Sequence, residues 1–127
     1  MDERTMPGEL LDLVLKHFDR PDEVRTFTRG RFELVHIGGQ TLGRATYQPG
    51  WRWSVDVGPT VGKKLCDVGH LGLVLSGRAT VAFEDGRVEV LAPGTLFHVG
   101  AKPHDSWVVG EEPYTSLHFL GAERYAR

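Results

Sequence analysis

The chain has 127 residues, 40% of them apolar, with a net charge of −2, 16 glycines and one cysteine. This length fits a single domain with one core, and the mixed charges without a basic block exclude a nucleic-acid partner. No apolar run reaches the roughly 20 residues of a membrane span, and the polar N-terminus does not resemble a signal peptide. One cysteine excludes an internal disulfide and fits a reducing compartment, so we expect a cytoplasmic protein.

One helix is predicted, over Pro7–Phe18. Its apolar residues follow the i, i+3, i+4, i+7 spacing of a helix that packs on the outside of a sheet. A loop follows at residues 19–22, where Pro21 interrupts the pattern.

Short strands separated by Gly and Pro turns dominate the rest of the chain. Phe32–Ile37 and Thr41–Tyr47 flank Gly38-Gly39 and form a predicted hairpin, whereas Val55–Lys64 is predicted to be a loop. The further predicted strands are Leu65–Leu75, Arg78–Glu84, Arg87–Leu91, Thr95–Val99, His104–Val109 and Tyr114–Leu120. Many short strands and only one helix predict an all-β jelly roll or barrel.

The stretch Cys66–Gly77 contains the most chemistry. In a strand, residues two apart share a face, so Lys64, Cys66 and His70 line one side of it. A thiol and an imidazole are ligands suited to transition metals. The sequence therefore predicts that Cys66 and His70 converge on one point.

This stretch resembles the first motif of the cupins, in which two histidines, a glutamate and a closing glycine have fixed spacing. Aligned on Gly77, the three ligand positions of the motif fall on Lys64, Cys66 and His70. Pro93–His104 resembles the second cupin motif.

In that second motif Gly94 is the glycine and His104 the ligand histidine. The stretches at residues 50–54 and 104–110 also resemble small bacterial single-domain cupins of the conserved-barrel type. The resemblance implies one cupin domain over residues 1–127, with an N-terminal helix and lead-in at 1–30 and a jelly-roll β-barrel at 31–121.

The resemblance and the spacing together predict a metal held by Cys66, His70 and His104. Zinc, iron, nickel and copper suit a thiolate and two imidazoles. Trp53, Lys64 and His98 are candidate residues of an adjoining pocket for a small molecule, although each also has an ordinary structural or surface interpretation. His118, on one face with Ser116 and Tyr114, could line the barrel interior, although a structural or surface role is its more ordinary interpretation.

Two functions stay open at this stage. One is a metal-dependent enzyme of oxygenase or isomerase type. The other is a non-catalytic module that binds or senses a small ligand. This alternative is favoured by Lys64 and His70, which stand at motif positions usually occupied by His and Glu. We also expect a homodimer, because a β-rich barrel of this kind leaves sheet edges that need covering.

Overall fold

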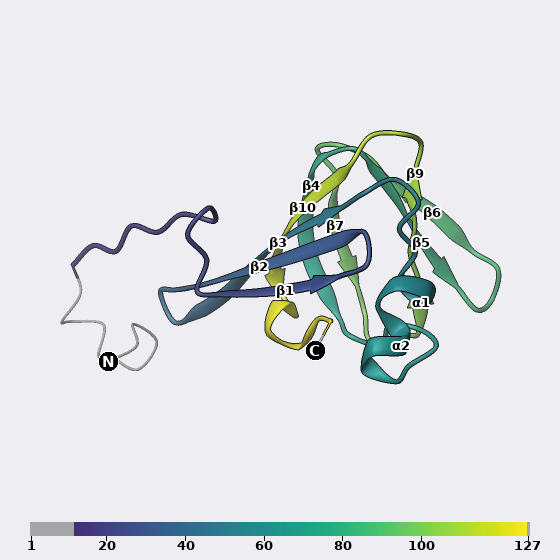
Figure 1. Cartoon of the computed structure of the whole chain (residues 1–127), viewed down its shortest axis with the longest axis horizontal. Helices are drawn as coiled ribbons and strands as arrows, with labels where there is room; N and C mark the ends of the chain where they lie inside the picture. Colours follow the sequence, from purple (N-terminus) through teal and green to yellow (C-terminus); the bar gives the residue numbers. More distant parts are fainter. Residues whose placement is uncertain (1–11, 127) are drawn as a thin grey trace.

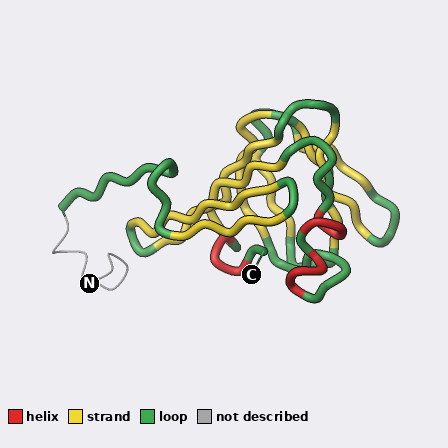
Figure 2. Tube along the Cα trace, viewed as in Figure 1, coloured by secondary structure: helices red, strands yellow, loops and turns green. Residues whose placement is uncertain are grey.

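The computed structural model describes residues 12–126, and two antiparallel sheets dominate it (Figures 1 and 2). The larger sheet has the strand order β1-β2-β3-β10-β4-β7, and the smaller has the order β6-β5-β8 with β9 also paired to β5. The strands are β1 (Glu23–Phe27), β2 (Gly30–Ile37), β3 (Gln40–Tyr47), β4 (His70–Ser76), β5 (Arg78–Phe83), β6 (Val88–Leu91), β7 (Leu96–Val99), β8 (His104–Asp105), β9 (Val108–Val109) and β10 (Tyr114–Leu120). This arrangement confirms the predicted all-β class.

The core lies between the two sheets, and glycines make room for its aromatic rings. Phe32 on β2 is fully buried, and its ring covers Gly43 of β3, where any Cβ would overlap it. Phe97 on β7 covers Gly72 of β4 in the same way. Because a side chain at either glycine would displace a core ring, these glycines fix the depth of the core beneath the larger sheet.

The predicted hairpins form as expected. β2 and β3 pair along their whole length around Gly38-Gly39, and β5 and β6 flank the turn at Asp85-Gly86. β10 has the predicted bounds and lies between β3 and β4 in the middle of the larger sheet.

The predicted N-terminal helix is wrong over residues 12–18, which are irregular and partly turned, and its first part lies outside the described residues. Leu13 and Leu15 are 74% and 83% exposed, so these two apolar side chains do not pack on a sheet. A short helix depends on such packing for most of its stability. β1 instead opens the fold as an edge strand beside β2, which the sequence analysis did not predict.

The predicted loop at 55–64 is also wrong. It contains two single-turn helices, α1 (Trp53–Asp56) and α2 (Gly58–Val61), and a third short helix, η3 (Ala122–Arg124), follows β10. Figure 1 shows α1, α2 and the C-terminus at the same end of the molecule. Among residues 12–126, no helix has the length and apolar character needed to cross a membrane.

Candidate functional site

Two parts of the chain that are distant in the sequence bring Cys66, His70 and His104 together. Cys66 pairs with His104 through two backbone hydrogen bonds of 2.9 and 3.0 Å, and His70 is the first residue of β4. All three side chains are buried, and one potential ligand atom from each lies within 4.8 Å of the others. The predicted convergence of these three residues is therefore present in the structure.

The route by which Cys66 and His70 meet differs from the prediction. β4 begins only at His70, and residues 67–69 before it are irregular, so the two side chains do not share a continuous strand face. Gly121, with a φ of 84°, packs so closely on the carbonyl of Gly69 that a Cβ would overlap it. This contact shapes the bend that turns both Cys66 and His70 inward.

His104 has one ring nitrogen fixed and the other available. Its Nδ1 lies 2.8 Å from the carbonyl oxygen of Lys102, which can only accept, so Nδ1 carries the proton and donates it. Nε2 is then the atom with a free lone pair. A backbone carbonyl holding the far nitrogen is the usual support of a metal-binding histidine.

Burial keeps the imidazoles of the site neutral. It lowers the pKa of His70 to about 2, and the nearby His118 and His104 act in the same direction. Burial also lowers the pKa of His104. Burial raises the pKa of the Cys66 thiol to about 11, so without a metal the sulfur keeps its proton. The site thus offers two neutral imidazoles and a thiol that must lose a proton to bind a cation.

A cavity of about 50 Å³ adjoins these side chains inside the barrel. Its wall is mostly aromatic and apolar, and no Asp, Glu, Lys or Arg is among the described residues that line it. The lining residues are Tyr47, Trp51, Trp53, Cys66, His70, Val81, Leu91, Phe97, Val99, His104, Ser106, Tyr114, Ser116, His118 and Tyr125. This volume has room for a few water molecules or a molecule of about four heavy atoms.

Of the three candidate pocket residues, only Trp53 lines this cavity. Lys64 lies exposed in the segment before Cys66, and His98 is exposed on β7 between the buried Phe97 and Val99. The assignment of Lys64 and His98 to the pocket is therefore wrong. Alternation along β7 directs His98 outward, and this signal was present in the sequence.

His118 and Tyr125 are among the cavity residues that were not predicted as site residues. His118 lines the cavity, and its Nε2 lies 3.1 Å from Oγ of Ser116. Tyr125 lies beyond the last predicted strand, yet its hydroxyl is 2.7 Å from that of Tyr47 and its ring centroid is 5.3 Å from that of His70. The shared face of Ser116 and His118 on β10 indicated that His118 could line the interior, whereas no sequence signal indicates Tyr125.

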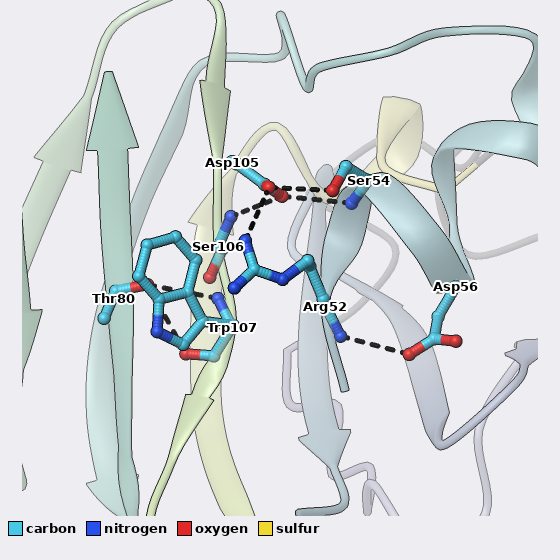
Figure 3. A network of polar contacts seen from close by, with 7 residues as sticks. All are labelled: Arg52, Ser54, Asp56, Thr80, Asp105, Ser106 and Trp107. Atoms are coloured by element: carbon cyan, nitrogen blue, oxygen red, sulfur yellow. Dashed lines mark hydrogen bonds and ion pairs between the residues drawn. The ribbon is translucent and has the colours of Figure 1, made fainter. Parts of the chain in front are cut away.

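A carboxylate next to His104 holds α1 against the smaller sheet (Figure 3). Asp105 accepts hydrogen bonds from the backbone amide and hydroxyl of Ser54 at 3.0 and 2.8 Å, and from Arg52 at 3.2 Å. The Arg52 guanidinium also lies 4.2 Å from the centre of the Trp107 ring. Because α1 begins at Trp53, these bonds fix the Trp53 indole in the cavity wall.

A scan against protein-family models finds no match for the sequence, and a search of curated proteins finds none either. Solved structures do match. The ectoine synthase of P. lautus has a TM-score of 0.59 at 10% identity, covering 88% of this chain and 83% of that one. A protein of unknown function from Acidithiobacillus ferrooxidans has a TM-score of 0.57 at 20% identity, covering 77% and 86%.

A cupin-like protein from Thermotoga maritima has a TM-score of 0.53 at 12% identity, covering 81% of this chain and 78% of that one. The chain is thus a small domain with the cupin fold, as the sequence predicted. Proteins with this fold include enzymes and proteins of unknown function, so the fold does not determine an activity.

Proposed function

We propose that this cupin-type domain binds a divalent transition metal through Cys66, His70 and His104 and presents it to a small molecule in the adjoining cavity. The observation that carries the proposal is the buried convergence of the three side chains, with ligand atoms no more than 4.8 Å apart. Bonds of about 2.0–2.3 Å in a tetrahedral site separate ligand atoms by roughly 3.5 Å, so the group needs only a small contraction.

The donor set fits a metal of the zinc, iron, nickel or copper group. The thiol sulfur of Cys66 lies 3.4 Å from Nε2 of His70, a separation suited to two ligands of one ion. His104 presents Nε2 because its Nδ1 is already engaged by a backbone carbonyl. Both contacts are those expected of a donor set arranged for a cation.

Three protein ligands beside a cavity leave a coordination position free, which is typical of catalytic rather than sealed structural sites. When bound, the metal would supply Lewis acidity or redox capacity to a small organic molecule. The chain's own contribution is to exclude bulk water with aromatic side chains and to keep both imidazoles neutral.

A metal-free module that binds a small ligand is the second candidate, favoured by the exposure of Lys64 at the first ligand position of the motif. Elemental analysis of protein purified without a nickel column tests the two. We expect about one transition metal per chain, lost on dialysis against a chelator. Substoichiometric metal that cannot be restored by added zinc, iron, nickel or copper would contradict the proposal and leave the ligand-binding module.

A further inference from the structure

Four buried side-chain nitrogens of the cavity wall lack a partner among the described residues: Nδ1 of His70, Nδ1 of His118 and two indole donors. Nε1 of Trp51 and Nε1 of Trp53 form no hydrogen bond within residues 12–126, although these side chains are only 1% and 4% exposed. Both residues line the cavity next to Cys66 and His70. An indole N–H can only donate, and leaving it buried without an acceptor is unfavourable.

A third donor comes from a pair of tyrosines. The hydroxyl of Tyr47 donates to that of Tyr125 over 2.7 Å, so Tyr125 keeps its own hydrogen for another acceptor. Both residues line the same cavity, and the ring of Tyr125 packs against that of His70. Buried polar side chains normally find a partner, and this one lies beside the two indoles in a single small space.

Among residues 12–126, the wall of the cavity has no carboxylate or amide side chain that could accept a hydrogen bond from a ligand. No Asp, Glu, Asn or Gln is among the described residues that line it. A ligand that carries an ammonium group would lose its hydration there without gaining an anionic partner. A ligand with acceptor oxygens would instead satisfy the unpartnered donors.

We propose that the cavity binds a small carboxylate or carbonyl compound whose oxygen atoms accept hydrogen bonds from the indoles of Trp51 and Trp53 and from the hydroxyl of Tyr125. This inference rests on the proposed function, because it names the ligand class of the same cavity. The three donors are present in the chain itself, so the ligand class can be tested with and without metal.

C-terminal packing holds Tyr125 in place. The guanidinium of Arg25 on β1 donates to the carbonyl oxygens of Ala122, Glu123 and Tyr125 at 3.2, 2.9 and 2.6 Å. Arg25 is therefore a positioning residue for the third donor. The indoles are positioned independently, since Trp53 N donates to Ser106 and Val108 N donates to Trp51.

The test follows the indole N–H signals by ¹⁵N–¹H NMR during titration of the metal-free and zinc-loaded chain. The probes are acetate, acetone and isopropylammonium, which have the same number of heavy atoms and differ in charge and in acceptor oxygens. The third tryptophan, Trp107, lies outside the cavity and is the internal control. Trp→Phe substitutions at each position assign the three signals.

We expect acetate or acetone to move the Trp51 and Trp53 signals downfield and to leave Trp107 in place, whereas isopropylammonium moves none of them. A response to acetate alone assigns a carboxylate, and a response to acetone alone a carbonyl compound. Tyr125→Phe should weaken binding about three- to tenfold, the range expected for one neutral hydrogen bond. Trp107→Phe should leave the affinity unchanged.

Equal or stronger shifts with isopropylammonium would overturn the ligand class. So would unmoved Trp51 and Trp53 signals with both oxygen probes, since the indoles would then be satisfied by water alone. Zinc content is measured on the same samples. Loss of zinc binding with intact indole shifts contradicts the metal proposal alone, and zinc binding without indole shifts contradicts this inference alone.

Discussion

The sulfur of Cys66 lies 3.4 Å from Nε2 of His70 in the interior of the barrel. Since burial raises the pKa of the thiol to about 11 and lowers that of His70 to about 2, the pair holds its proton on sulfur. A divalent cation would replace that proton and bind both atoms. Metal affinity should therefore rise with pH, because each bound ion releases the thiol proton.

Removing single ligands tests this pairing. His70→Ala, His104→Ala and Cys66→Ser should each weaken zinc binding by more than the roughly 10–100-fold typical of residues that only support a ligand. Equilibrium dialysis with elemental analysis measures the affinity, and circular dichroism checks the fold. His98→Ala, on the outer surface of β7, is the matched control and should bind like the parent. Unchanged affinity in Cys66→Ser would show that Cys66 is only a neighbour of the metal.

Substitution of Phe32 tests how much the buried core contributes to the stability of the fold. Its ring is fully buried and lies 5.2 Å from the His118 ring and 4.8 Å from the Tyr125 ring, measured between centroids. Phe32→Ala should lower the free energy of unfolding by about 3–5 kcal/mol, because it leaves a cavity between the sheets. Urea denaturation measures this change in the free energy of unfolding. Leu96→Ala, at a residue 71% exposed, should stay within about 0.5 kcal/mol of the parent.

Substitution of Asp105 tests whether its hydrogen bonds hold α1 against the smaller sheet. Asp105→Ala removes the acceptor of Ser54, Arg52 and the Ser106 amide, so we expect a loss of about 2–3 kcal/mol of unfolding free energy. Thermal denaturation measures the loss. Asp67→Ala is the matched control, since the Asp67–Lys63 pair is about half exposed and solvent weakens its contribution, so its thermal midpoint should stay close to that of the parent. Equal effects of the two substitutions would show that Asp105 does not hold α1.

The oligomeric state stays a prediction. β6 is an edge strand, and its Val88 and Val90 side chains are 48% and 55% exposed. Uncovered edges of this kind are suited to pairing with a second copy. Light scattering should give the mass of a dimer, and Val90→Lys should shift it toward the monomer. A parent mass that stays monomeric at every concentration would contradict the prediction.

The sequence predicted most of the larger sheet because alternation and turn residues are local signals. Gly38-Gly39 and Asp85-Gly86 mark their hairpins, and β10 was predicted to the residue. β1 was not predicted, because Glu23–Phe27 is a mostly exposed edge strand with little apolar alternation. The helix prediction used periodicity alone, and periodicity cannot show whether a packing surface exists.

The candidate ligands were predicted by motif spacing rather than by strand geometry. Cys66 and His70 converge across an irregular bend, so the assumption of a continuous strand was wrong although the pairing of the residues was right. The place of Tyr125 in the cavity wall could not be predicted, because a long-range contact with Arg25 on β1 positions it. Local patterns do not encode such contacts.

Buried histidines should make the fold sensitive to acid. Burial lowers the pKa of His70 to about 2 and that of His118 to about 4, below the value near 6.5 that each has in an unfolded chain. Between these values the unfolded chain binds protons that the folded chain cannot. The stability contributed by these groups is therefore complete above pH of about 6.5 and is lost as the pH falls toward about 4 for His118 and toward about 2 for His70.

The size of this loss can be measured on the metal-free protein. Each such histidine should lower the free energy of unfolding by about 2 kcal/mol between pH 7 and pH 5. His118→Gln should reduce the difference between the two pH values by about that amount, because Gln does not titrate and can still hydrogen-bond Ser116. Leu96→Gln, at a residue 71% exposed on β7, removes no titratable group and should leave the difference unchanged. If His118→Gln and Leu96→Gln show the same pH dependence, then folding does not lower the pKa of His118 and the cavity is more polar than its lining indicates.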